Sequence, residues 1–319
     1  MTDHQKPLHS GFNADSSTMD VISGVDLSGK RAIVTGGHSG LGLETTIALS
    51  KAGAAVTVAS RNVKEARTAT GNIPKVTVEQ LDLSDLQSVQ AFAEKVLKEG
   101  EHIDILINNA GVMAAPETRV GQNWEMQFAT NHLGHFALAN HLWPVLSGGA
   151  RVISVSSAGH HFSPIRWYDL NFADGYDKWV AYGQSKTANA LFALELDNLG
   201  REESVRAFSL HPGNIVTPLQ RHLTMEEMLA AGWIDADGNP LIPLKSPEQG
   251  AATAVWAATT PQLDGLGGLY CEDCDVAIRA NDTTPPLVGV KAYATDTDEA
   301  KRLWRVSAEL TGVNAFAKG

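Results

Sequence analysis

The fold is decided by the stretch Arg31-Ala32-Ile33-Val34-Thr35-Gly36-Gly37-His38-Ser39-Gly40-Leu41-Gly42, in which a short apolar run passes into a glycine-rich turn. A helix through Leu49 is expected to follow. A glycine turn that opens a helix lets the backbone approach a pyrophosphate, and the free N–H groups and the helix dipole favour that negative charge. Glycine clusters alone are weak evidence, but a position between a first strand and a helix predicts a dinucleotide-binding turn. Its contact residues are expected to be Gly36, His38, Ser39, Gly40, Leu41 and Gly42.

Outward from this turn, strands and helices alternate along the chain. Such alternation predicts βαβ units and a mainly parallel, doubly wound α/β sheet with helices on both faces. The chain has 319 residues, of which 43% are hydrophobic, enough for one large domain with a single core. Strands are expected at 31–35, 55–59, 76–78, 103–107, 151–155 and 205–210, and long helices at about 124–146 and 178–199.

The two ends of the chain differ from this regular centre. Residues 1–28 are polar and predict a flexible N-terminal arm, which could also lie on the surface of the domain, so the domain is expected to span 29–319. A poorly periodic insertion at about 217–245 predicts a mobile loop and helix near the substrate. A C-terminal extension at about 281–319 is expected to contain an amphipathic helix over 296–311, with Asp296 as its N-cap.

Composition narrows the possible partners and compartment. The formal net charge of −11 argues against nucleic acid or an anionic membrane as the main partner. Neither a signal peptide nor an apolar run of membrane-spanning length is recognisable, which predicts a cytoplasmic protein without a membrane anchor. The two cysteines lie in Cys271-Glu272-Asp273-Cys274, after an expected strand and without a second ligand pair. This placement favours unpaired thiols over a redox pair or half of a zinc site.

The end of the second strand, Ser60-Arg61-Asn62, bears on the choice of cofactor. NAD-binding sites usually place an acidic residue here to bind the ribose 2′-hydroxyl, and that carboxylate would repel a 2′-phosphate. Arg61 can instead make a forked contact with the phosphate, which favours NADP(H). The alternative is an exposed arginine at a strand end.

Two further strand ends carry candidate cofactor contacts. Asp82 and Leu83 follow the third strand, where the carboxylate could meet the adenine amino group or simply cap the next helix. The fourth strand ends in Asn108-Asn109-Ala110-Gly111, whose small residues suit close contact with a ribose. We therefore expect contacts from Asn109, Ala110 and Gly111.

A tyrosine and a lysine begin the second long helix, in Tyr182-Gly183-Gln184-Ser185-Lys186. Their spacing of four places both side chains on one helix face. A phenol has a pKa near ~10 and is a poor acid–base catalyst at neutral pH until it is tuned. A lysine ammonium and an oxidised nicotinamide would both favour the tyrosinate and lower that pKa. Lys186 can also bind the nicotinamide ribose.

Taken together, these motifs resemble the short-chain dehydrogenase/reductase superfamily over roughly residues 30–270. The matching features are the TGxxxGxG run at 35–42, the NNAG run at 108–111, an asparagine in the central helix, a serine after the fifth strand, the YxxxK pair and a Pro-Gly turn after the sixth strand. The resemblance implies a Rossmann-type sheet of about seven strands. It also implies hydride transfer between nicotinamide C4 and a carbonyl or alcohol carbon.

The resemblance also assigns roles to individual residues. Tyr182 is the implied acid/base, and Lys186 is the residue that tunes it. Ser157 resembles the serine that orients the substrate oxygen, with Ser156 as the adjacent alternative, and Asn131 resembles the asparagine that supports a water-linked proton relay. The nicotinamide carboxamide is implied to meet the segment after the sixth strand, through Pro212, Gly213, Ile215 and Thr217.

Within the superfamily, Asn131-His132-Leu133-Gly134-His135-Phe136 and the segment around Tyr270 resemble retinol dehydrogenase-like and WW-domain oxidoreductase-like members. Neither the membrane anchor nor the WW domain of those members is recognisable here, so the subgroup does not choose the substrate. The histidine pairs His132/His135 and His160/His161 lack a third ligand, which disfavours a metal site. Packing or positioning roles are favoured for His132 and His135. The segment that carries His160, His161, Phe162, Trp167 and Tyr168 is expected either to line a substrate entrance or to form a surface loop over the core.

The leading functional hypothesis is an NADP(H)-dependent carbonyl reductase or secondary-alcohol dehydrogenase acting on an apolar, fairly bulky small molecule. The pocket is expected to draw on residues 158–179 and on the insertion after Thr217, although the apolar residues there could merely pack the insertion onto the domain. Alternatives are a non-catalytic NADP(H)-binding regulator and an enzyme acting on retinoids. A homodimer or homotetramer built through the two long helices is possible. The apolar insertion residues are Leu219, Leu223, Met225, Met228 and Trp233.

Overall fold

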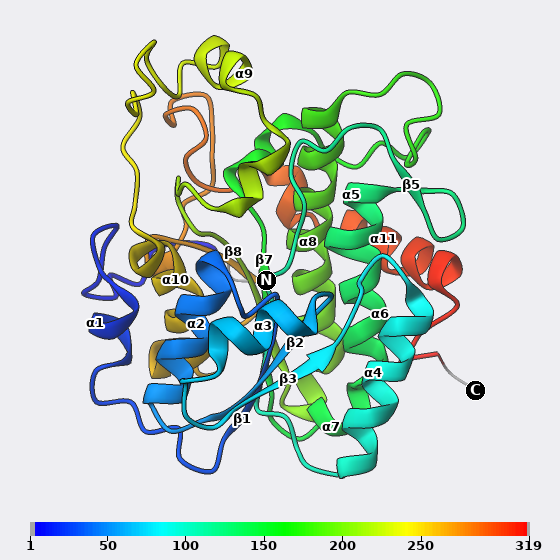
Figure 1. Ribbon diagram of the computed structural model, residues 1–319. Coiled ribbons are helices and arrows are strands. Elements are labelled where there is room, and N and C mark those ends of the chain that lie inside the picture. Colours follow the sequence, from blue (N-terminus) through cyan, green and yellow to red (C-terminus); the bar gives the residue numbers. More distant parts are fainter. Residues whose placement is uncertain (1–3, 318–319) are drawn as a thin grey trace.

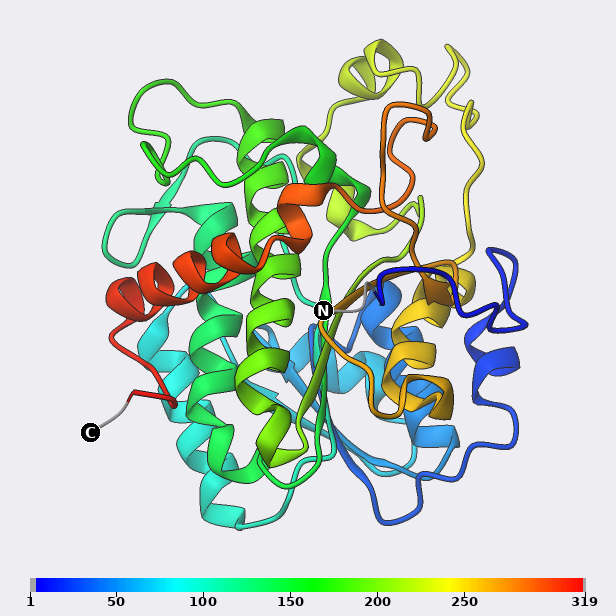
Figure 2. The same cartoon turned by 180° about the vertical axis from the view of Figure 1, so that it is seen from behind.

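The computed structural model describes residues 4–317 and shows an eight-stranded sheet between two layers of helices (Figures 1 and 2). The strand order is β10-β9-β8-β7-β4-β1-β2-β3, and every neighbouring pair is parallel except β9 and β10. The doubly wound Rossmann-type prediction is confirmed, and the short antiparallel β10 adds an eighth strand. The strands of this sheet are β1 Arg31–Thr35, β2 Ala55–Ser60, β3 Val76–Gln80, β4 Ile105–Asn108, β7 Arg151–Val155, β8 Arg206–His211, β9 Leu269–Glu272 and β10 Asp275–Val276.

The strand order reverses at β1, and this reversal positions the site. Ile33 of β1 pairs with Thr57 of β2 on one side and with Leu106 of β4 on the other. From β1 the chain winds to one edge of the sheet, and from β4 it winds to the other. The carboxyl ends of β1 and β4 therefore flank a crevice of the kind in which ligands of open α/β sheets bind.

Each face of the sheet carries its own helix layer and core. Buried residues of α1, α2, α3 and α10, including Leu49 and Trp256, form one core. Those of α4, α6, α7 and α8, including Phe136 and Phe192, form the other. The helices of the two layers are α1 Thr18–Ile22, α2 Gly40–Lys51, α3 Val63–Thr70, α10 Pro247–Thr259, α4 Leu86–Glu99, α6 Gly134–His141, α7 Trp143–Leu146 and α8 Lys178–Gly200.

The segment expected as one helix over 124–146 is divided in the structure, so this prediction is wrong in detail. Its first residues form β6 (Trp124–Glu125), which pairs with β5 (Arg119–Val120). The Glu125 side chain then caps α5 (Met126–Phe128) by accepting from two backbone N–H groups. The π-helical turn η1 (Ala129–Leu133) follows, and Pro144 near the start of α7 favours a new helix start there because proline lacks an N–H.

The N-terminal segment is packed against the domain over residues 4–28, and the expected flexible arm is corrected on this point. The Gln5 side chain donates to the carbonyls of Tyr270 and Ala277 at 2.8 and 2.7 Å and accepts from the Tyr270 N–H at 2.9 Å. Val21 and Ile22 of α1 are buried in the sheet core. The polar composition of this segment does not predict the packing. The packing depends on one glutamine side chain that bonds the backbone of β9 and of the residue after β10. Residues 1–3 lie outside the described residues.

The C-terminal helix α11 (Thr297–Thr311) crosses α8 on the outside of the molecule (Figure 2). Asp296 caps it, as predicted, by accepting from the N–H groups of Asp298 and Glu299. Its Trp304 ring stacks on Phe192 at 5.9 Å between centroids and meets the edge of Phe136 at 4.8 Å. The helix therefore buries part of the outer surface of α6 and α8.

Replacing Trp304 by alanine should lower the free energy of unfolding by about 3–5 kcal/mol, because the change removes a large buried aromatic and leaves a cavity. Trp304 is only 6% exposed. Chemical denaturation monitored by circular dichroism measures the effect. Arg305→Ala, a change at the exposed neighbour, is the matched control. A loss below about 1 kcal/mol for Trp304→Ala would contradict the packing described.

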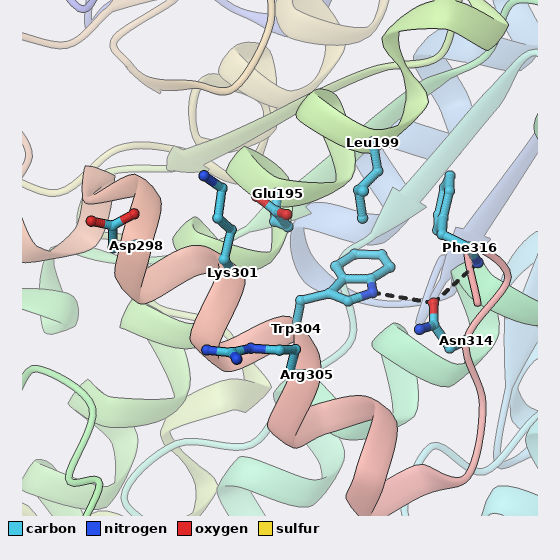
Figure 3. Close-up of a pocket in the computed structure, with 8 residues that line it drawn as sticks. All are labelled: Glu195, Leu199, Asp298, Lys301, Trp304, Arg305, Asn314 and Phe316. Carbon is cyan, nitrogen blue, oxygen red and sulfur yellow. Dashed lines mark hydrogen bonds between the residues drawn. The ribbon is translucent and has the colours of Figure 1, made fainter. Parts of the chain in front are cut away.

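A surface groove of about 590 Å³ lies beside Trp304 (Figure 3). It is separate from the crevice at the strand ends, because Glu195 and Leu199 line it near the far end of α8 from Tyr182. Glu195 lies thirteen positions after Tyr182 in the helix, which corresponds to roughly 20 Å along the axis. The remaining lining residues come from α11 and the chain after it: Asp298, Lys301, Trp304, Arg305, Asn314 and Phe316.

Among residues 4–317, no helix combines the length and apolarity that a bilayer crossing requires. The remaining elements are short. They are η2 Ala158–Phe162, η3 Arg201–Glu203, η4 Pro218–His222, α9 Met225–Ala230, η5 Pro261–Leu263 and η6 Ala292–Thr295.

Candidate active site

The glycine turn after β1 forms a cradle that side chains could not occupy. A Cβ built on Gly42 would lie 2.4 Å from the Gly36 carbonyl oxygen, and one on Gly36 would lie 3.2 Å from Ala110 Cβ. Gly36 also adopts a positive φ of 65°. The turn from β1 and the NNAG run from β4 therefore meet with their backbones exposed at the reversal of strand order. This geometry fits the close approach of a dinucleotide pyrophosphate.

Thr35, the last residue of β1, ties these two motifs together. Its Oγ1 accepts from the N–H groups of Asn109 and Ala110 at 2.9 and 3.0 Å, and its carbonyl accepts from Asn109 Nδ2 at 2.9 Å. The Asn109 side chain is thus used to hold the two turns together. Ala110 and Gly111 remain the residues whose small size leaves room at the crevice.

His38 lies in the glycine turn and carries a polar atom without a partner among the described residues. This atom, Nδ1, is buried. Burial lowers the pKa of His38, and the nearby Glu65 carboxylate opposes that shift. An unpaired buried nitrogen is costly unless a ligand satisfies it, so His38 fits a contact with a polar cofactor group. Ser39 is the N-cap residue of α2, but its side chain makes no capping hydrogen bond. Its hydroxyl is therefore also available to a cofactor.

The predicted adenosine-side residues differ in how they are engaged. Arg61 is exposed directly after β2. The Asp82 carboxylate accepts from the Ser84 N–H at 2.9 Å and from the Ser84 hydroxyl at 2.6 Å. The alternative in which Asp82 caps the next helix is wrong, because Asp85 caps α4 by accepting from the Gln87 N–H. Contact of Asp82 and the buried Leu83 with adenine stays a prediction.

Tyr182 and Lys186 lie one turn apart at the start of α8, facing the end of β7. Lys186 Nζ donates to the Val155 carbonyl at 2.9 Å and lies 5.6 Å from the centre of the Tyr182 ring. Ser157, the second residue after β7, lies close enough to Tyr182 for its hydroxyl to lower the pKa of the phenol. Ser156 instead donates to the Lys186 carbonyl at 2.7 Å. Of the two serines, Ser157 is therefore the one that faces the tyrosine.

Burial moves the pKa values of both groups in opposite directions. It raises the pKa of Tyr182 to about 12, against a smaller lowering by the Ser157 hydroxyl, and it lowers the pKa of Lys186 to about 7. The direction for Tyr182 is opposite to the one expected from a neighbouring ammonium, because desolvation by burial is the largest influence on the pKa of this phenol. A lowered tyrosine pKa stays a prediction for the chain with oxidised nicotinamide bound. By itself the chain holds a protonated phenol, which can donate a proton.

Asn131 lies in the π-helical turn and is fully buried. Its Oδ1 accepts from the Val112 N–H at 2.8 Å, and its Nδ2 donates to the Val112 carbonyl and to Ser185 Oγ, both at 2.9 Å. A Cβ on Gly111 would lie 3.1 Å from Asn131 Oδ1 and 3.7 Å from Lys186 Nζ. The asparagine thus holds the NNAG segment beside Lys186, and its part in a proton relay stays a prediction.

His135 connects two parts of the candidate site, in keeping with the positioning role favoured over a metal site, although the sequence did not reveal its partners. Its Nε2 lies 2.9 Å from Thr35 Oγ1, and its Nδ1 lies 2.9 Å from the Asn131 carbonyl. Only Nδ1–H can be a donor to a carbonyl, so Nε2 accepts the Thr35 hydroxyl proton. Burial lowers the pKa of His135 to about 4 and keeps the ring neutral. One histidine therefore links the cofactor turn to Asn131, and the i, i+4 spacing from Asn131 is the signal that could have found it.

His160 was expected at the substrate entrance or on a surface loop, and both expectations are wrong for this residue. It is buried, and its Nδ1 donates to the Ser157 carbonyl at 2.7 Å. Its Nε2 accepts from the Lys291 N–H at 3.1 Å, which fixes that tautomer. The Tyr270 hydroxyl donates to the same Ser157 carbonyl at 3.1 Å. The turn that carries Ser157 is therefore held from the C-terminal part of the chain.

The aromatic residues that follow His160 in the chain make contacts in different parts of the molecule. Phe162 meets Trp179 edge to face at 6.0 Å on the substrate side. Trp167 donates to Glu299 on α11 at 2.6 Å, and the Tyr168 side chain is 84% exposed. Among residues 4–317 there is no cluster of three potential metal ligands. The Nε2 atom of His132 forms a hydrogen bond with the Ser307 hydroxyl on α11 at 2.7 Å.

The insertion after β8 supplies an apolar wall beside Tyr182. Leu219 and Leu223 of this insertion pack with Met113, Tyr182 and Trp179. Two contacts anchor the segment to the start of α8: Trp233 meets Trp179 at 5.6 Å, and Glu227 of α9 pairs with Lys178. Met225, in contrast, is 59% exposed. Of the apolar residues expected here, Leu219 and Leu223 therefore face the site, whereas Met225 faces solvent.

The segment between β8 and this wall passes close to the glycine turn. Gly213 has a positive φ of 95°, which permits the sharp turn after Pro212. A Cβ on Gly250 of α10 would lie 2.6 Å from Ile215 and 2.7 Å from Leu41, so these two predicted contact residues pack at one point. Thr217 lies against Gly40. The predicted cofactor residues of the two segments are thus neighbours in space.

The cysteines lie on the opposite side of β9 from this chemistry. Both thiols are free and buried, and Asp273 and Cys274 form the turn between β9 and β10 with positive φ values of 50° and 59°. Burial raises the pKa of both thiols, to about 11 for Cys274. Two protonated, enclosed thiols are poor nucleophiles and poor metal ligands.

Comparisons with known proteins agree with the fold. The family model for short-chain dehydrogenases matches residues 30–228. A protein of Streptomyces antibioticus named probable oxidoreductase is 46% identical over 89% of this chain and 98% of its own. Human retinol dehydrogenase 11 is 38% identical over 91% of this chain and 88% of its own. The crystal structure of an uncharacterised protein from Mycobacterium paratuberculosis superposes with a TM-score of 0.73 at 32% identity, covering 95% of this chain and all of the other. The chain belongs to the short-chain dehydrogenase family of oxidoreductases, with similarity to its retinol dehydrogenase-like members.

Proposed function

We propose that this oxidoreductase uses NADP(H) to interconvert a carbonyl compound and a secondary alcohol, acting on an apolar, fairly bulky small molecule. The observation that carries the proposal is the convergence of the Tyr182 phenol, the Ser157 hydroxyl and the Lys186 ammonium beside the glycine cradle. A bound nicotinamide supplies the hydride for reduction and accepts it in oxidation. Gly36, Gly42 and Ala110 would hold the pyrophosphate side, and Ile215 and Thr217 the nicotinamide side.

The protein's own part in the reaction is orientation and proton transfer. Tyr182 and Ser157 both present hydroxyl groups to one point, where a carbonyl oxygen can accept two hydrogen bonds. As the carbon gains hydride, Tyr182 donates its proton to that oxygen. Lys186, held by the Val155 carbonyl, stabilises the negative charge that develops on the phenol oxygen. Oxidation reverses each step.

The apolar wall supports the proposed substrate class. Leu219, Leu223, Met113 and Trp179 surround the phenol with hydrocarbon and aromatic surface, which disfavours a charged substrate. A retinoid is a second candidate within the same class, supported by the 38% identity to human retinol dehydrogenase 11. We further propose that the enzyme acts in the cytoplasm and without nucleic-acid partners. Assembly into a homodimer or homotetramer also belongs to this proposal.

Arg61 is the basis for proposing NADP(H) rather than NAD(H). Replacing it with alanine should raise KM for NADPH about tenfold or more and change KM for NADH little, because charge-assisted bonds to the 2′-phosphate are lost. The measurement is cofactor consumption at 340 nm with a panel of apolar ketones and aldehydes. An equal change for both cofactors would show that Arg61 does not bind the 2′-phosphate. Cofactor binding without turnover of any carbonyl or alcohol would favour the non-catalytic regulator.

A further inference from the structure

The short helical turn η4 joins the cofactor cradle to the substrate wall. Thr217 caps η4, and a Cβ built on Gly40 would lie 3.4 Å from Thr217 Cβ and 4.0 Å from Pro218 Cδ. The start of η4 is therefore in contact with the glycine turn. Leu219 of η4 and Leu223, the residue after it, pack against the cluster that contains Tyr182. A ligand held at the cofactor side of η4 would fix the position of the substrate wall.

Arg221 is carried by this turn on the side of the cofactor. Its Nη1 donates to the Pro218 carbonyl at 3.1 Å, so the guanidinium folds back toward the residues that touch Gly40. Arg61 lies close enough for its charge to act on Arg221. Burial is the main cause that lowers the pKa of Arg221, and the positive charge of Arg61 lowers this pKa further.

The charges of Arg61 and Arg221 act on each other, and among the described residues neither side chain is paired with a carboxylate. The formal net charge is −11, yet across residues 4–317 no ion pair forms with either Arg61 or Arg221. Like charges at close range are unfavourable, and an anion placed between them reverses the sign of the interaction. A guanidinium pair can grip a phosphate through several parallel N–H···O bonds.

We propose that Arg221 is a second binding residue for the 2′-phosphate of NADP(H), opposite Arg61, and that through η4 this phosphate fixes the substrate wall. The inference rests on the proposed use of NADP(H). It adds a residue from the insertion to a site otherwise built from β2. NADPH, unlike NADH, would then order Leu219 and Leu223 around Tyr182 before the substrate arrives.

Isothermal titration calorimetry with NADPH and NADH tests the binding role without relying on turnover. Arg221→Gln should weaken NADPH binding about tenfold and change NADH binding less than twofold, whereas Arg221→Lys should retain part of the NADPH affinity. Combining Arg61→Ala with Arg221→Gln should bring the two dissociation constants close together. Arg305→Gln, which removes an exposed arginine of α11, is the matched control and should change neither constant. Unchanged melting temperatures show that the variants fold.

Limited proteolysis within residues 217–245 tests the link to the substrate wall. NADPH should slow cleavage more than NADH in the natural chain, and Arg221→Gln should remove that difference. If Arg221→Gln weakens both cofactors equally, or neither, the proposal is overturned. In that case a selective effect of Arg61→Ala still supports the proposed function. A natural chain that binds NADPH no better than NADH would overturn both.

Discussion

Replacing Tyr182 by phenylalanine should lower kcat/KM for carbonyl reduction by about 10²–10⁴-fold while NADPH binds as before. The substitution removes one oxygen atom from a buried ring that Gly159 admits, since a Cβ on Gly159 would lie 2.6 Å from the tyrosine ring. The ring therefore keeps its place, and only the proton donor is lost. Steady-state kinetics and calorimetric NADPH titration separate the two effects.

Tyr168→Phe is the matched control for this prediction, because it deletes the same hydroxyl from a ring that is 84% exposed. It should leave both kinetics and binding unchanged. Equal rates for the natural chain and Tyr182→Phe would exclude the phenol as the proton donor. The proton would then have to come from another group or from water.

Replacing Lys186 by methionine should reduce kcat by about 10²–10³-fold and, at the same time, make the fold more stable near neutral pH. The loss of turnover follows from removing the charge that stabilises the developing phenolate. The gain in stability follows from removing a buried ammonium. Its acceptor, the Val155 carbonyl, remains satisfied because Asn189 Nδ2 also donates to it at 3.0 Å.

The pH dependence of the free energy of unfolding distinguishes the removal of a buried charge from a stabilisation that does not involve titration of Lys186. Burial lowers the pKa of Lys186 from 10.5 to about 7 in the folded chain, so between these values the unfolded chain binds more protons. The contribution of Lys186 to the free energy of unfolding should therefore rise with pH from about 7 to about 10.5. Lys186→Met should lack this rise and be more stable at pH 7 by on the order of a few kcal/mol. Chemical denaturation at pH 7 and pH 9 measures both, with the exposed Lys301→Met as control. A less stable variant with the natural pH slope would contradict the buried charge.

The sheet and the placement of Tyr182 and Lys186 on one helix could be predicted because they depend on local patterns. The run at 31–42 specifies a strand, a positive-φ glycine and a helix start within a dozen residues, and the structure forms them there. The i, i+4 spacing of Tyr182 and Lys186 needs only a helix. Parallel pairing then brings these motifs to one edge of the sheet.

Features that depend on distant contacts could not be predicted in the same way. Gln5 bonds the backbone of residues more than 260 positions away. His160 receives its role from Tyr270 and from the Lys291 N–H, and neither partner is visible from the local sequence. The division of the helix expected at 124–146 arises because Glu125 caps α5 and a two-stranded ribbon uses Trp124. In each case tertiary hydrogen bonds outweigh local propensity.

Isotope transfer tests the central claim most directly. A carbonyl substrate found in the panel is incubated with NADPH carrying deuterium at nicotinamide C4, prepared separately in each of its two stereochemical forms. Mass spectrometry should find one deuterium on the carbinol carbon of the product from one form and none from the other. It should also find no deuterium on carbon when the label is supplied as heavy water. An alcohol product without cofactor deuterium from either form would contradict direct hydride transfer and with it the proposed reaction.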